Sequence, residues 1–99
     1  MNLAEITERV RTQVADKSGL DAKVNFNFGA DGHLYIDGTT APYAVTNDDK
    51  EADCTITISL ANFEKLITGK MGATTAFMMG RLKVAGSMGV ATKLSSLLG

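Results

Sequence analysis

Hydrophobic residues at the start of the chain recur with the period of an α-helix. They stand at steps of three and four positions, at Leu3, Ile6, Val10 and Val14. Because a helix turns once in about 3.6 residues, this spacing places their side chains on one face. Asn2 stands directly before the pattern, and asparagine is a favoured N-cap. The pattern predicts an amphipathic helix that covers one side of a hydrophobic core.

From residue 23 the pattern changes to alternation of hydrophobic and polar residues, which is typical of half-buried strands. The first run alternates Val24, Phe26 and Phe28 with the polar Lys23, Asn25 and Asn27. Comparable runs follow at 33–37, 43–46 and 54–58, and turn-forming residues separate them, including a polar turn at 47–51. These four runs predict an antiparallel meander. A further strand at 81–84 places Leu82 and Val84 on its inner face.

Helical spacing returns in the second half of the chain. Ser59 is a suitable N-cap for a helix over 60–67, a short helical segment is expected over 74–79, and a last helix begins near Met88. A length of 99 residues is typical of one domain. The sequence therefore predicts a single α+β domain over residues 1–99, with a five-stranded, mostly antiparallel sheet covered on one face by about four to five helices.

Composition and charge exclude several functional classes. Ten basic and eleven acidic residues give a net charge of −1, without the basic stripe that is typical of nucleic-acid-binding proteins. No apolar run approaches the ~20 residues that a membrane-spanning helix requires. The first residues lack the basic start and apolar stretch of a signal peptide. We expect a soluble cytoplasmic protein that does not bind nucleic acid.

Few residues suit catalysis or metal binding. His33 is the only histidine and stands beside a turn, where an exposed polar residue is ordinary. Cys54, the only cysteine, alternates with Ile56 and Ile58, which indicates a small core residue rather than a reactive thiolate. The acidic residues within 48–53 lack the ligand spacing and central glycine of a calcium loop. We therefore predict no catalytic residue, no metal site and no cofactor.

The methionines are concentrated in the second half of the chain. Four of the five, Met71, Met78, Met79 and Met88, lie within residues 60–98. Methionine is flexible and polarisable, so it suits a surface that adapts to varied apolar ligands, but it also fills irregular gaps in a core. Composition alone favours the core role, and a ligand site needs more specific support.

Four motifs between residues 68 and 89 are more specific. They are Thr68-Gly69-Lys70, Thr75-Ala76-Phe77, Gly80-Arg81-Leu82-Lys83-Val84 and Gly86-Ser87-Met88-Gly89. Together they resemble the signature of the sterol carrier protein 2 family, and the order of elements upstream is similar to that family over nearly the whole chain. The resemblance implies a mixed five-stranded sheet with helices on one face and an apolar tunnel between the two layers.

The resemblance also implies a function and a set of binding residues. Members of the family bind sterols, fatty acids, acyl-CoA thioesters or phospholipids. We therefore expect this chain to carry a lipid-like ligand (fatty acid, acyl-CoA, sterol or isoprenoid-like) without catalysing a reaction. Carried over residue by residue, the tunnel is expected to be lined by Phe63, Leu66, Ile67, Phe77, Met78, Met79, Leu82, Val84, Met88, Ala91 and Leu94.

Two departures from the family pattern and several alternatives affect this hypothesis. Met79 stands where several members have glutamine, which removes a polar anchor for a ligand head group and weakens the case for sterol. The chain ends in Leu97-Leu98-Gly99, without the peroxisomal tripeptide of many relatives, so we expect a free-standing prokaryotic or cytosolic member. The same apolar groove also suits a partner helix, a homodimer, or presentation of an intermediate to an enzyme of lipid or quinone metabolism. Transient contact with a membrane is compatible with lipid carriage.

Overall fold

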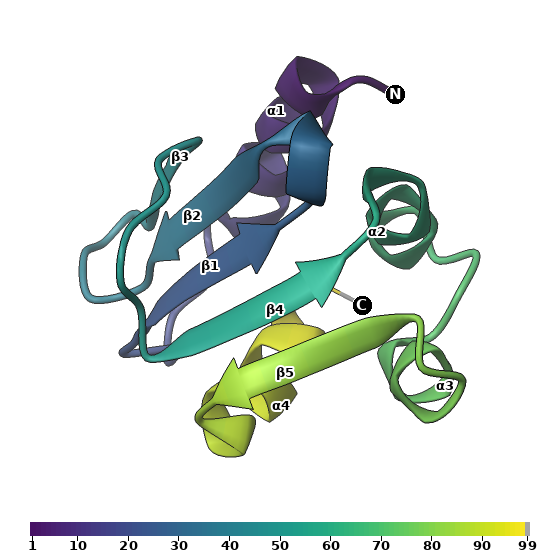
Figure 1. The fold of residues 1–99 in the computed structure, drawn as a ribbon. Helices are drawn as coiled ribbons and strands as arrows, with labels where there is room; N and C mark the ends of the chain where they lie inside the picture. Colours follow the sequence, from purple (N-terminus) through teal and green to yellow (C-terminus); the bar gives the residue numbers. More distant parts are fainter. Residues whose placement is uncertain (99) are drawn as a thin grey trace.

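The computed structural model describes residues 1–98, which form a five-stranded sheet and four α-helices (Figure 1). In chain order the elements are α1 (Leu3–Val14), β1 (Lys23–Asn27), the 3₁₀ turn η1 (Gly29–Asp31), β2 (His33–Asp37), β3 (Ala44–Thr46), β4 (Cys54–Ile58), α2 (Leu60–Ile67), α3 (Ala73–Met78), β5 (Leu82–Gly86) and α4 (Met88–Leu98). The predicted α+β class and mostly antiparallel sheet are confirmed. Bounds differ by one or two residues, since β3 begins after Tyr43 and β5 extends to Gly86.

The order of strands in the sheet is β3-β2-β1-β4-β5, which corrects the predicted meander. β4 pairs in parallel with β1 and not with β3, while the other three pairs are antiparallel. Alternation shows which face of a strand is buried, but it does not show which strand lies beside it or in which direction. The pairing aligns Phe26 with Ile56, and Ile56 with Val84. These three side chains, from three neighbouring strands, therefore share one face of the sheet.

The segment between β3 and β4 crosses the outer face of the sheet. β3 forms one edge and β4 lies beyond β1, so the connection passes the ends of β2 and β1 (Figure 1). The Asn25 side-chain amide donates to Asp49 Oδ1 at 3.0 Å and to the Lys50 carbonyl at 3.1 Å. Asn25 is only 4% exposed, although the alternation predicts a solvent-facing position. The expected polar turn at 47–51 thus covers part of the outer face.

The helices lie on the other face and at one end of the sheet. α1 and α4 lie behind the sheet in the view of Figure 1, and α2 and α3 lie beside the ends of β4 and β5. α1 begins with the expected cap, because Asn2 Oδ1 accepts from the Glu5 amide at 2.9 Å. The residues of α1 that are completely buried are Ile6, Val10 and Val14. α1 therefore closes one half of the core, and α2, α3 and α4 close the other half.

Candidate ligand-binding site

A cavity of about 220 Å³ lies between the sheet and the three C-terminal helices. Its wall combines side chains from β1, β4 and β5 with side chains from α2, α3 and α4. The lining residues are Phe26, Ile56, Phe63, Leu66, Ala73, Thr74, Phe77, Leu82, Val84, Met88, Ala91, Thr92, Leu94 and Ser95. Strands that are far apart in the sequence therefore contribute to one apolar wall, because β4 pairs with both β1 and β5.

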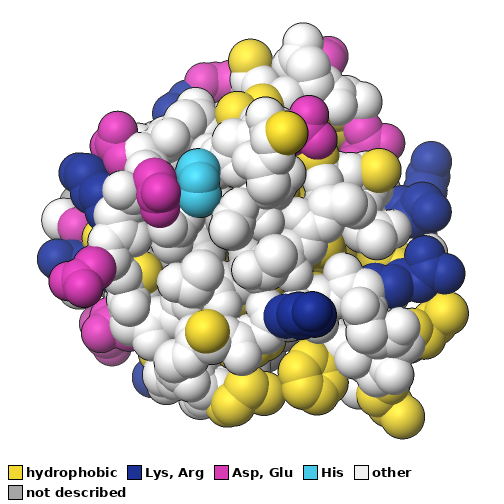
Figure 2. All heavy atoms as spheres, viewed as in Figure 1, with side chains coloured by type: hydrophobic (Ala, Val, Ile, Leu, Met, Phe, Trp, Pro, Cys, Tyr) yellow, Lys and Arg dark blue, Asp and Glu magenta, His cyan; other side chains and the backbone are white. Residues whose placement is uncertain are grey.

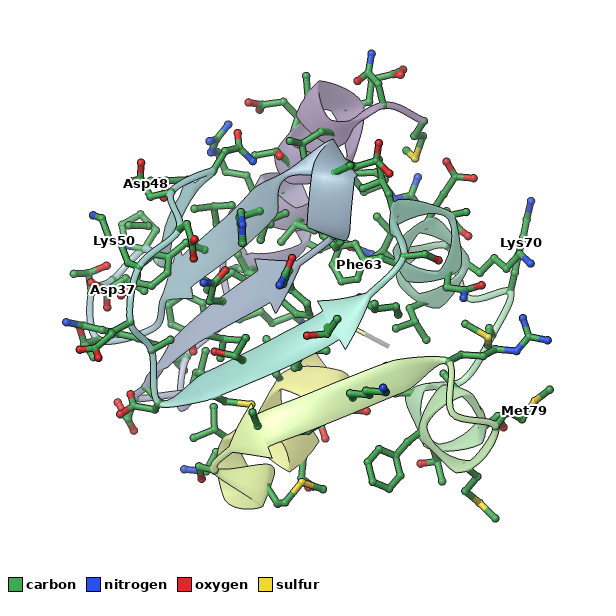
Figure 3. The ribbon with its side chains drawn as sticks, in the orientation of Figure 1. Asp37, Asp48, Lys50, Phe63, Lys70 and Met79 are labelled. Carbon is green, nitrogen blue, oxygen red and sulfur yellow. The ribbon has the colours of Figure 1, made fainter. Side chains whose placement is uncertain are left out.

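The cavity has a buried floor. Phe63 is completely buried, Leu94 is 1% exposed and Phe26 is 2% exposed. Phe63 lies between α2 and the strands β1 and β4 (Figure 3). Its ring centre is 4.7 Å from that of Phe26 and 5.1 Å from that of Phe28. Such tilted aromatic contacts stabilise the packing of this apolar floor.

The opposite end of the cavity is open to solvent. Phe77 of α3 and Met88 of α4 both line the cavity, yet they are 48% and 51% exposed. Thr74 and Thr92 are exposed lining residues on the same two helices. The hydroxyl of Thr92 donates to the Met88 carbonyl at 3.0 Å. The cavity is thus apolar at its floor and mixed in character at its mouth.

The lining is mostly apolar and carries no charge. Among the described residues that line the cavity, none has an ionisable side chain. The polar lining groups are the hydroxyls of Thr74, Thr92 and Ser95. These groups can accept or donate hydrogen bonds, but they carry no charge at neutral pH. The arrangement can hold an apolar body and leave a polar end near water.

Eight of the eleven residues predicted for the tunnel lie together in this lining. They are Phe63, Leu66, Phe77, Leu82, Val84, Met88, Ala91 and Leu94. The other three, Ile67, Met78 and Met79, lie outside the lining. Ile67 belongs to the main core, where its carbonyl accepts from the Gln13 side chain of α1 at 3.0 Å. The structure thus places these three positions outside the cavity, and a role in ligand binding stays a prediction for all eleven.

The geometry of α3 explains the placement of the two methionines. α3 has only six residues, and Ala76 is its one buried residue. Successive residues on a helix are rotated by about 100°, so the positions after Phe77 turn away from the cavity. Met78 and Met79 are accordingly 80% and 59% exposed. Their apolar character indicated burial, but so short a helix buries only one narrow face.

Six lining residues were missed by sequence reasoning. They are Phe26, Ile56, Ala73, Thr74, Thr92 and Ser95. Helical spacing offered a signal for two of them, because Met88, Ala91, Thr92 and Ser95 recur at steps of three, one and three. Phe26 and Ile56 were expected to face inward, but only the parallel pairing of β1 with β4 places them beside Val84.

Residues 3–99 match the sequence model of the SCP-2 sterol transfer family. The chain belongs to this family. Human sterol carrier protein 2 is 53% identical over 51 residues, which are 52% of this chain and 9% of that protein. The chain therefore matches only a small part of the length of that relative.

Solved structures of SCP-2 domains share the fold. The sterol carrier protein domain 2 of Helicoverpa armigera superposes with a TM-score of 0.73 and 27% identity, covering 96% of this chain and 83% of that one. Palmitated SCP2L2 from Aedes aegypti superposes with a TM-score of 0.72 and 21% identity, covering 99% and 95%. At that lower identity the likeness shows the fold alone.

A second cavity of about 300 Å³ adjoins the first in this SCP-2 domain. Its lining residues are Leu66, Gly69, Met71, Gly72, Ala73 and Ser95. Leu66, Ala73 and Ser95 also line the first cavity, so they form the wall between the two spaces.

The other chemical candidates of this SCP-2 domain lie outside both cavities. His33 Nε2 is 3.6 Å from Asp49 Oδ2. Cys54 is fully buried, and burial raises the pKa of its thiol, which keeps it protonated at neutral pH. Within residues 1–98, no group of three or more His, Cys, Asp or Glu side chains is arranged to hold a metal ion. In the same part of the chain no helix has the length and apolarity needed to cross a membrane.

Proposed function

We propose that this SCP-2 domain binds a single-chain amphiphilic lipid, with fatty acids and acyl-CoA thioesters as the preferred class, and catalyses no reaction on it. The chain of the ligand would occupy the cavity, and its polar end would lie at the mouth near Thr74 and Thr92. The observation that supports this proposal is the gradient from the buried Phe63 and Leu94 to the half-exposed Phe77 and Met88. An amphiphile has the same gradient along its length.

The size of the cavity favours a chain over a rigid ring system. Its volume of about 220 Å³ exceeds the ~150 Å³ that accommodates benzene, but it is below the ~300 Å³ at which typical ligand pockets begin. A flexible chain can fill such a space and then extend past Leu66 into the adjoining cavity of about 300 Å³. A sterol nucleus has no such freedom, and it would require the helices to separate before binding. Sterol is therefore the less favoured ligand.

Burial of an acyl chain is sufficient for binding without a charged anchor. Each CH₂ group removed from water contributes ~0.8 kcal/mol. Twelve to sixteen groups give a gross term on the order of 10 kcal/mol, from which the entropy of association must be subtracted. Micromolar affinity is therefore attainable, with low discrimination between head groups. This expectation agrees with a lining that has hydroxyls but no charges.

Titration with saturated fatty acids of increasing length tests the proposal. We expect the affinity to rise about fourfold for each added CH₂ until the cavity is full, and then to level off. A ligand at 100 times its Kd should add ~2.7 kcal/mol of stability and raise Tm by roughly 10 °C. Isothermal calorimetry and thermal unfolding provide the two measurements. An affinity that does not depend on chain length would refute the proposal.

A second candidate function is a protein-interaction module, including one that serves an enzyme of lipid metabolism. The observation that favours it is the exposure of Met78 and Met79, which a partner helix or a second copy could cover. Sedimentation velocity over a hundredfold range of concentration, without lipid, separates the two candidates. A monomer at all concentrations favours the carrier. Association that grows with concentration favours the interaction module.

A further inference from the structure

Four large apolar side chains are exposed around the mouth of the cavity. Phe77, Met78, Met79 and Met88 are 48%, 80%, 59% and 51% exposed. We call these four residues the mouth patch. Phe77 and Met88 also line the cavity, so the patch is continuous with the cavity wall. Large apolar side chains gathered at one place on a surface commonly mark an interaction site.

Basic residues flank the mouth patch in the sequence. Lys70 precedes α3, while Arg81 and Lys83 follow it, and all three are exposed. Within the described residues none of these three side chains forms an ion pair. Lys70 and Met79 lie on the same side of the molecule, and Asp37 and Asp48 lie on the opposite side (Figure 3).

The whole chain shows the same separation of charge. Residues 1–53 contain five basic and ten acidic residues, whereas residues 54–99 contain five basic residues and one acidic residue, Glu64. The carboxylate of Glu64 accepts from the N-terminal ammonium group. Figure 2 shows hydrophobic side chains along the lower edge, basic side chains on the right and also on the left, and most acidic side chains on the left and at the top. A net charge of −1 therefore combines an acidic first half of the chain with a basic second half.

We propose that the mouth patch docks onto the surface of an anionic lipid bilayer. Phenylalanine and methionine side chains would enter the boundary between head groups and acyl chains, and Lys70, Arg81 and Lys83 would contact anionic head groups. The basic rim argues against a second copy as the occupant, because two facing patches would bring like charges together. The acidic residues of the first half of the chain would face away from the membrane.

Docking in this orientation would also give the ligand a route into the cavity. The mouth of the cavity would face the bilayer, so a lipid could pass between bilayer and cavity without crossing water. This route for the ligand rests on the proposed function, whereas docking itself does not. Docking also accounts for the two methionines outside the cavity lining, since they would be buried in the membrane and not in the protein.

Flotation with lipid vesicles tests the proposal. We would compare vesicles of phosphatidylcholine alone with vesicles that contain a quarter phosphatidylglycerol, using the ligand-free chain. The chain is expected to float with the anionic vesicles and to be released by high salt. Each neutralised basic residue at the surface should weaken binding about fivefold, so Arg81→Gln with Lys83→Gln should weaken it about 25-fold. Met78→Ser with Met79→Ser should also reduce binding to the anionic vesicles.

A matched control distinguishes an effect of the residues beside the mouth patch from an effect of net charge alone. Arg9 and Lys17 are exposed basic residues of the N-terminal region, and neither forms an ion pair within the described residues. Arg9→Gln with Lys17→Gln changes the net charge by the same amount as the first pair, but should change vesicle binding less than about twofold. Equal weakening by both pairs, or stronger weakening by the control pair, would overturn the proposal.

Fatty-acid titration of the same variants distinguishes this proposal from the proposed function. Arg81, Lys83, Met78 and Met79 do not line the cavity, so their variants should retain the affinity of the unaltered chain for fatty acid. A chain that binds fatty acid but does not float with anionic vesicles overturns docking alone. A chain that floats in the expected order but binds no fatty acid supports docking and refutes only the carrier function.

Discussion

Ala91→Trp is expected to weaken fatty-acid binding about 50-fold or more while the domain stays folded. Ala91 lies on α4 and lines the cavity at a partly exposed position, so a large ring can enter the cavity without first displacing a buried side chain. An indole would occupy much of a space of about 220 Å³. Exclusion of only three CH₂ groups of the ligand removes about 2.4 kcal/mol, which weakens binding roughly 50-fold. Calorimetry with the best-bound fatty acid measures the loss.

Ser96→Trp provides the matched control on the same helix. Ser96 is exposed and does not line the cavity, so the ring there should remain in solvent and binding should be unchanged. Thermal unfolding without ligand confirms that both variants are folded. The Ala91 variant should not lose stability from the filled space, because filling a cavity restores contacts that its walls lack. A folded Ala91→Trp protein with normal affinity would show that the lipid binds elsewhere.

Much of the cavity wall could be predicted because its residues follow local periodicity. Phe63 and Leu66 are three positions apart on α2, and Leu82 and Val84 alternate on β5, so each pair faces one direction. The motifs shared with the family then indicated which face borders a cavity. Local periodicity failed at α3, where Met78 and Met79 extend past the single buried face of a six-residue helix.

The arrangement of strands could not be predicted in the same way. Hydrophobic alternation in 54–58 is equally compatible with pairing to β3 or to β1, because either neighbour leaves the same face buried. Long-range contacts decide the order, including the hydrogen bonds from Asn25 to Asp49 and Lys50 that hold the crossing segment on the outer face. The placement of Phe26 and Ile56 in the cavity wall follows from this pairing. Two of the four strand residues in the wall therefore depend on information that no single segment contains.

The tight turn from β5 into α4 requires a glycine at position 86. Gly86 has φ of +96°, and it is aligned with Cys54 in the β4–β5 pair. A Cβ atom at this position would lie 2.4 Å from the Asp53 carbonyl oxygen, which cannot move freely because it is backbone. The next residue, Ser87, donates its amide to the same oxygen at 2.9 Å. The chain thus turns tightly from β5 into α4, which supplies one wall of the cavity.

Gly86→Ala is therefore expected to destabilise the domain by about 3 kcal/mol, from a strained backbone and from the steric overlap together. Urea denaturation measures the free energy of unfolding. Gly80→Ala separates the two causes, because Gly80 also has a positive φ of +70° but has open space where the Cβ would lie. That variant should lose only about 1 kcal/mol. Equal losses in the two variants would show that the contact with Asp53 relaxes at little cost, and that the start of α4 does not depend on it.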